Sequence, residues 1–101
     1  MSDSADGEDI HDDGWPCLFS EAVAALLEDL TTTFDLLTAI LALSVEINTT
    51  RGNPKGYTVD PAAPAFRRVV VSTDKAMFVA EFTVLADADA PYSILTRVQP
   101  L

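Results

Sequence analysis

The sequence predicts an α+β fold in which two helices pack on a three- to four-stranded antiparallel sheet. Strands are indicated at residues 69–71, 77–85 and 94–98, because β-branched and aromatic residues dominate there and turn residues separate them. Two apolar helical patterns precede these strands. The chain has 101 residues, of which 49% are hydrophobic, which is enough for one modest core.

The middle strand has one apolar face that needs a cover. Side chains alternate along a strand, so one face of residues 77–85 carries Phe78, Ala80, Phe82 and Val84. The other face carries Val79, Glu81 and Thr83. We therefore expect the helices to pack against the face with the two phenylalanines.

Two helices are predicted before the strands. Ser20 is a good N-cap for a helix over residues 21–30, whose apolar residues follow the spacing of an amphipathic helix. The threonines at positions 31–33 interrupt it and can cap a second helix over residues 34–48. Apolar residues run nearly all round this second helix. It is expected to lie between the first helix and the sheet, or to present one flank to a partner chain.

The remaining segments complete a single domain over residues 15–101. Residues 1–14 hold six acids and are predicted to be a disordered tail; we interpret His11, which lies among its acids, as solvated and not as a metal ligand. Residues 15–19 are a candidate first strand. Residues 49–65 contain Gly and Pro and are interpreted as a long irregular connection, with a brief extended piece at residues 57–59.

The net charge of −10 is distributed unevenly along the chain. Residues 1–50 contain eleven acids and no Lys or Arg, whereas residues 51–101 contain five acids and six bases. The overall excess of acid opposes nonspecific attraction to nucleic acid, although a local basic patch on the sheet is compatible with it. Sparse lysine with abundant aspartate is also typical of adaptation to high salt.

Composition further predicts a soluble cytoplasmic protein without cofactor or metal. The single Cys17 cannot form an internal disulfide, and it is interpreted as a small buried residue and not as a nucleophile. The chain begins without the pattern of a signal peptide. Its most apolar stretch, residues 36–45, is shorter than the roughly 20 residues of a membrane span.

One constellation of charged residues is a candidate site. Arg67, Glu81 and Arg97 come from the three successive strands and are expected to share the face opposite the Phe78/Phe82 core. Two guanidiniums around a carboxylate can hold an RNA phosphate or stabilise negative charge that develops at phosphorus. Alternatively, the three residues form a cross-strand ion pair worth about 0–1 kcal/mol.

Further residues are candidates for contact with RNA or a partner: Arg51, Lys55, Tyr57 and Arg68. The motifs of phosphate-binding glycine loops, zinc sites and nucleophilic serines are absent from the sequence.

The order of the segments resembles the RelE/ParE superfamily of small bacterial and archaeal toxins. The resemblance rests on a first strand, two helices and a three-stranded meander, with FRRVVV at residues 66–71, FVAEFTV at 78–84 and SILTRV at 93–98. It implies a ribosome-dependent or free endoribonuclease, or a gyrase inhibitor, neutralised by an antitoxin that wraps around the domain. By resemblance, Arg67 or Arg68 and Arg97 occupy places comparable to the family's basic residues. The sequence departs from the family in lacking a terminal His or Tyr and in having acidic helices.

Two functional hypotheses follow from the sequence. The first is a toxin-like component of a type II toxin–antitoxin pair that acts on RNA or translation, as a metal-independent endoribonuclease or as a degenerate relative without activity. The second is a non-catalytic acidic module that self-associates or inhibits a basic nucleic-acid-binding protein. The partners expected are an antitoxin or another protein, a second copy, and RNA or the ribosome, but not a membrane.

Overall fold

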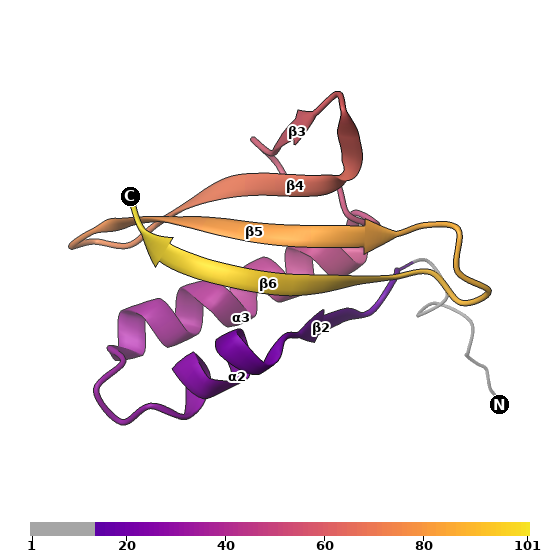
Figure 1. The fold of residues 1–101 in the computed structure, drawn as a ribbon. Coiled ribbons are helices and arrows are strands. Elements are labelled where there is room, and N and C mark those ends of the chain that lie inside the picture. The colour runs from indigo at the N-terminus through magenta and orange to yellow at the C-terminus, as the bar shows by residue number, and fades with distance from the viewer. Residues whose placement is uncertain (1–13) are drawn as a thin grey trace, which may run out of the picture.

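A computed structural model describes residues 14–101 of the chain, and the predicted acidic tail with His11 falls outside the described residues apart from Gly14. In chain order the elements are β2 (Cys17–Phe19), α2 (Glu21–Glu28), α3 (Phe34–Thr49), β3 (Thr58–Asp60), β4 (Ala63–Ser72), β5 (Met77–Leu85) and β6 (Tyr92–Pro100). Figure 1 shows β4, β5 and β6 side by side, with α2 and α3 on one side of them. The α+β class is confirmed.

The sheet is mixed and has one strand more than expected. Its five strands lie in the order β2-β6-β5-β4-β3. The first strand is parallel to the last, with Leu18 opposite Ile94, while every other neighbouring pair is antiparallel. A parallel pair needs a long connection, which the two helices and the meander provide. The fifth strand is β3, which forms within the connection predicted to be irregular and pairs with the start of β4.

Side-chain caps set the start of both helices. The hydroxyl of Ser20 accepts a hydrogen bond from the backbone N–H of Val23 at 3.3 Å, and that of Thr33 accepts one from Leu36 at 3.2 Å. The first helix ends two residues earlier than predicted, because the Asp29 carboxylate accepts hydrogen bonds from the backbone and side chain of Thr31. No helix in residues 14–101 is long and apolar enough to cross a membrane.

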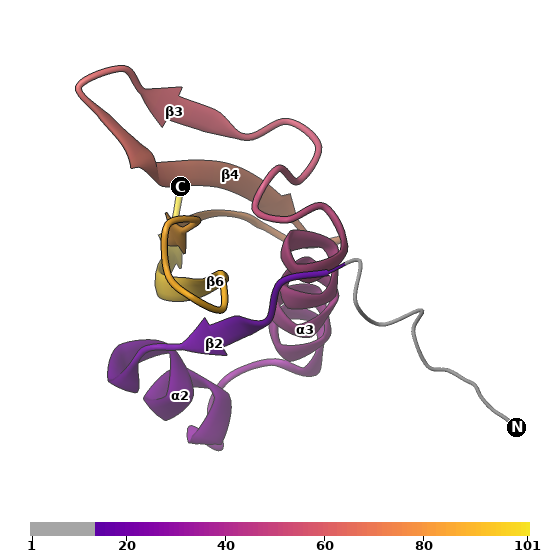
Figure 2. The ribbon, with the colours of Figure 1, turned by 90° about the vertical axis from the view of Figure 1, so that its right-hand side faces the viewer.

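The core lies between α3 and one face of the sheet. Figure 2, which is turned by 90° from the view of Figure 1, shows α3 next to the sheet and α2 on the outer side of β2. Four residues on one side of α3 are buried: Leu36, Ile40, Leu43 and Ile47. They belong to the same core cluster as Ala80, Phe82 and Val84 of β5, the face that was expected to need a cover.

The end of α3 is fixed by two residues with positive φ angles, Arg51 and Gly52. The backbone N–H of Gly52 donates to the carbonyl of Ile47 at 2.9 Å, which satisfies one of the last helical carbonyls. This turn brings Gly52 directly against the side chain of Val84. The connection that follows α3 therefore begins next to the core.

Candidate functional site

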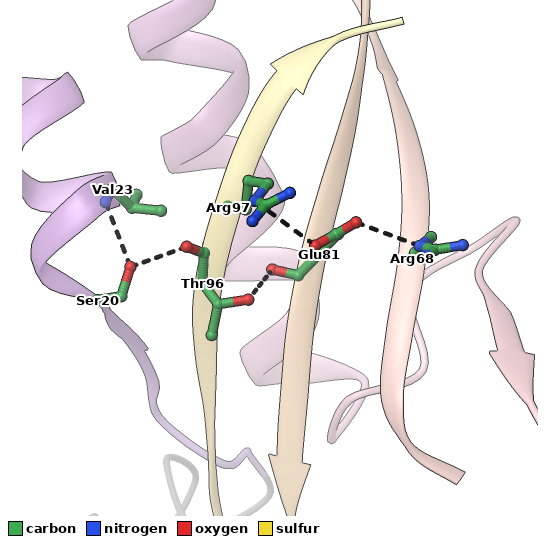
Figure 3. Close-up of polar contacts among 6 residues, drawn as sticks. All are labelled: Ser20, Val23, Arg68, Glu81, Thr96 and Arg97. Carbon is green, nitrogen blue, oxygen red and sulfur yellow. Dashed lines mark hydrogen bonds and ion pairs between the residues drawn. The ribbon is translucent and has the colours of Figure 1, made fainter. Parts of the chain in front are cut away.

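A row of three charged residues crosses the sheet face opposite α3. Arg68 of β4 is the register partner of Glu81 in β5, and Glu81 is the register partner of Arg97 in β6. Figure 3 shows the three side chains pointing toward one another from adjacent strands. We refer to Arg68, Glu81 and Arg97 as the charged row.

Glu81 lies between the two guanidiniums and contacts each through a different oxygen. Its Oε2 lies 3.3 Å from Nε of Arg68, and its Oε1 lies 3.9 Å from Nε of Arg97. The Glu81 side chain is only 13% exposed, whereas those of Arg68 and Arg97 are 58% and 60% exposed. Both contacts use Nε, so the terminal nitrogens of the two guanidiniums keep their donors for an anion that arrives from solvent.

A β-bulge at Thr96 places Arg97 in the row. Phe82 pairs with Leu95, yet Glu81 pairs with Arg97, so Thr96 is the extra residue of β6. Strict alternation from the buried Leu95 would have turned Arg97 toward the core.

Two hydrogen bonds hold the bulged residue. The Thr96 hydroxyl donates to the Glu81 carbonyl at 3.1 Å, and the Thr96 carbonyl accepts from the Ser20 hydroxyl at 3.0 Å. The N-cap of α2 is therefore connected directly to the strand segment that positions Arg97.

The expectation that Arg67 shares this face with Glu81 and Arg97 is wrong. Arg67 alternates with Arg68 along β4 and lies on the side of the buried Val69. Its Nη1 donates to the Gly52 carbonyl and to the Asn53 side chain, each at 2.6 Å. Its guanidinium also lies 5.1 Å from the centre of the Tyr57 ring. Arg67 therefore connects the α3–β3 segment to β4. Arg68, and not Arg67, occupies the predicted position beside Glu81.

The other predicted contact residues do not join the charged row. Arg51 stacks on Trp15 at 5.9 Å, next to the end of α3. Tyr57 packs against the core, beneath Arg67. The backbone N–H of Lys55 donates to the Glu46 carboxylate at 2.6 Å, on the α3 side of the sheet. Of the four residues predicted to contact RNA or a partner, the structure brings only Arg68 to the row.

An open cleft lies next to Arg68 and is lined by residues of the β3–β4 hairpin. It has a volume of about 330 Å³ and is lined by Thr58, Val59, Asp60, Pro61, Phe66 and Arg68. The Arg68 guanidinium lies 5.5 Å from the centre of the Phe66 ring. The sequence interpretation missed Phe66 as a site residue, although its position two residues before Arg68 puts both on one face of β4.

Possible metal ligands and the single cysteine complete the chemical groups of the described residues. Within residues 14–101 no three His, Cys, Asp or Glu side chains are grouped so that they could hold a metal ion. Burial raises the pKa of the Cys17 thiol to about 11, against a weaker opposing effect of a backbone hydrogen bond at Leu95. The thiol therefore stays protonated at neutral pH.

Fold and site together define a small α+β protein with two guanidiniums presented on an open sheet face. Comparisons of the chain with protein-family models, curated proteins and solved structures return no significant match.

Proposed function

We propose that this chain is a toxin-like component of a toxin–antitoxin pair, with the architecture of the RelE/ParE superfamily, and that its charged row binds phosphate groups of RNA. The observation that carries the proposal is the pair of exposed guanidiniums held on either side of Glu81. The order of strand, two helices and meander supports the relationship to the superfamily.

The charged row suits binding because Glu81 restrains both arginines before a ligand arrives. Ordering a long side chain costs free energy on binding, and part of that cost is already met here. The bulge at Thr96 supports a functional role as well, since bulges that re-aim a side chain are common next to active sites. A phosphate can accept hydrogen bonds from the terminal nitrogens of Arg68 and Arg97 without displacing Glu81.

Cleavage of RNA would need a general base and a general acid, which the charged row does not supply. Its one carboxylate, Glu81, already contacts two guanidiniums. The sequence has a single histidine, His11, which lies outside the described residues. We therefore propose that this protein acts on RNA or the ribosome by binding and not by hydrolysis.

RNA binding can be tested by fluorescence anisotropy with a labelled single-stranded RNA. Replacing both arginines, R68Q/R97Q, should weaken binding by about 100-fold or more, because each of the two lost charged hydrogen bonds is worth about 1.5–3 kcal/mol. The double variant K55Q/K75Q removes the same charge outside the row and should change the affinity about twofold or less. Equal losses in the two double variants would reject the site.

Toxicity can be tested by expressing the chain alone in a host cell and following growth. We expect growth to slow with the natural sequence and to recover with R68Q/R97Q at the same soluble yield. Normal growth with the natural sequence at good soluble yield would contradict the toxin-like role but leave RNA binding to be judged by anisotropy.

A second candidate is a non-catalytic acidic module that binds a basic protein. The observation that favours it is the charge distribution, since residues 1–50 contain eleven acids and no Lys or Arg. RNA binding by the charged row would favour the first candidate. Binding of a basic protein, without RNA binding, would favour the second.

A further inference from the structure

Helix α3 is apolar on two sides, and only one of them faces the sheet. Large apolar residues on the other side are exposed: Phe34 by 79%, Leu41 by 50% and Val45 by 62%. Leu30, in the turn before the helix, is fully exposed. Two alternatives were predicted for this helix, a place between the first helix and the sheet or one flank presented to a partner chain, and in the described residues one flank is exposed.

The exposed residues form a continuous stripe. Within α3, the exposed residues and the partly buried Leu37 recur every three or four residues, which places them along one side of the helix. We refer to Phe34, Leu37, Leu41 and Val45 as the outer α3 stripe. From Phe34 to Val45 it extends roughly 16 Å at 1.5 Å per residue, the length of three turns of a docked helix. Regular apolar stripes on a surface commonly mark binding sites.

The charges around the outer α3 stripe are all negative within residues 14–50. Five acids and no Lys or Arg occur there: Glu21, Glu28, Asp29, Asp35 and Glu46. Asp35 follows Phe34 directly, and Glu28 and Asp29 come directly before Leu30. Arg51 and Lys55 follow α3 in the chain, and the backbone of Lys55 contacts the carboxylate of Glu46. A second copy would bring the same acids against these acids, whereas a basic partner would complement them.

We propose that the outer α3 stripe docks an amphipathic helix that carries Lys and Arg beside its apolar face. Apolar side chains of the partner helix cover the outer α3 stripe, and its basic residues lie against Asp35 and Glu28. This surface goes beyond RNA binding by the charged row, which lies on the opposite face of the sheet. It gives the acidic-module candidate a defined binding site.

The proposal can be tested by isothermal titration with two synthetic peptides on the full chain. Both peptides share the same helical pattern of leucines, and the remaining positions are Lys in one and Glu in the other. We expect the Lys peptide to bind at least about tenfold more tightly than the Glu peptide, with an affinity that falls as salt rises. The variant D35N/E28Q should reduce this preference.

Variants of exposed residues locate the binding surface without disturbing the core. L41S/V45S should weaken binding of the Lys peptide about tenfold, because two apolar contacts are lost. V70S is the matched control, since Val70 is 49% exposed but lies on the sheet face opposite α3. It should leave peptide binding unchanged, and L41S/V45S should leave RNA binding unchanged.

Three results would overturn the proposal. The first is equal affinity for the Lys and Glu peptides. The second is an equal loss of affinity in V70S and L41S/V45S. The third is a stable dimer of the natural chain in sedimentation that L41S/V45S dissociates, which would assign the outer α3 stripe to a second copy.

Discussion

At the scale of single residues, Glu81 determines how the two guanidiniums of the sheet face are positioned for anion binding. Its carboxylate lies between Arg68 and Arg97 and lowers the local positive charge, yet it also keeps both side chains over the same spot on the sheet. The two arginines are more than half exposed, so the ion pairs add little stability, at most about 1 kcal/mol. Glu81 therefore matters more for the position of two guanidiniums than for the stability of the fold.

Replacing Glu81 with Gln should lower the affinity for RNA about threefold or more, because the neutral amide no longer restrains the two arginines, whose side chains must then be ordered on binding. The free energy of unfolding should fall by no more than about 1 kcal/mol. Anisotropy and thermal unfolding measure the two effects. Asp87→Asn removes the same charge from the exposed turn before β6 and is the control. An equal gain in affinity for both variants would mean that only net charge matters and that Glu81 does not position the arginines.

Cys17 should react slowly with alkylating reagents in the folded protein. Burial raises its pKa from 9.0 to about 11, so the thiolate fraction at pH 8 falls by about 100-fold relative to the unfolded chain. The rate of iodoacetamide labelling, followed by mass spectrometry with and without denaturant, measures this difference. Equal rates would contradict the burial of the thiol. Because the unfolded chain ionises first, the contribution of Cys17 to stability should decline as the pH rises from about 9 toward 11.

At the scale of elements, the end of α3 controls how the connection and β3 meet the sheet. Gly52 has a φ of 86°, and a Cβ atom there would lie 2.6 Å from Cγ2 of Val84. Gly56 has a φ of 82°, but nothing lies within 4 Å of the place where its Cβ would be. The two glycines share the strained backbone angle and differ in the space around them.

Gly52→Ala should therefore destabilise the protein more than Gly56→Ala. Both variants lose about 1 kcal/mol from the positive φ angle, and overpacking against Val84 costs Gly52→Ala about 1–3 kcal/mol more. Chemical denaturation measures the difference. Equal losses would show that the turn after α3 relaxes away from Val84.

The sequence predicted the elements better than the faces of the strands. Capping residues and apolar spacing placed the second helix at residues 34–48, against Phe34–Thr49 in the structure, and the middle strand at its observed bounds. In β4 the run Val69-Val70-Val71 is apolar on both faces, so it did not tell which of Arg67 and Arg68 lies on the open face. Burial of Val69 and Val71 settles that question in favour of Arg68.

Two features had no readable signal in the sequence. The bulge at Thr96 depends on hydrogen bonds with Glu81 and Ser20, which are distant in the chain. The extended piece predicted at residues 57–59 overlaps β3, but the pairing of β3 with β4, in a segment rich in Gly and Pro, depends on tertiary contacts. The relationship to the RelE/ParE superfamily and the role on RNA stay predictions.

At the scale of the whole molecule, the acids of the two helices and the arginines of the charged row lie on opposite sides of the sheet. Helices α2 and α3 carry acids but no Lys or Arg, while the arginines of the charged row lie on the far face of the sheet. An RNA that approaches the sheet face is attracted locally and repelled by the rest of the molecule. Binding should therefore depend on a few contacts and not on a broad basic surface.

The salt dependence of RNA binding tests this description. If two phosphates are contacted, the logarithm of the affinity should fall with the logarithm of salt concentration with a slope of about −1.4. R68Q/R97Q should bring the slope close to zero, and K55Q/K75Q should leave it unchanged. Anisotropy titrations at several salt concentrations give these slopes. A slope of about −4 or steeper in the natural protein would indicate a broad basic surface instead.

The most direct test of the charged row is nuclear magnetic resonance of the labelled protein during titration with single-stranded RNA. The Nε–H signals of Arg68 and Arg97 and the backbone signals around Glu81 should shift together, while those of α3 stay in place. Shifts confined to α3 or to the surroundings of Lys55 and Lys75, with the two arginine signals unmoved, would contradict phosphate binding at the charged row.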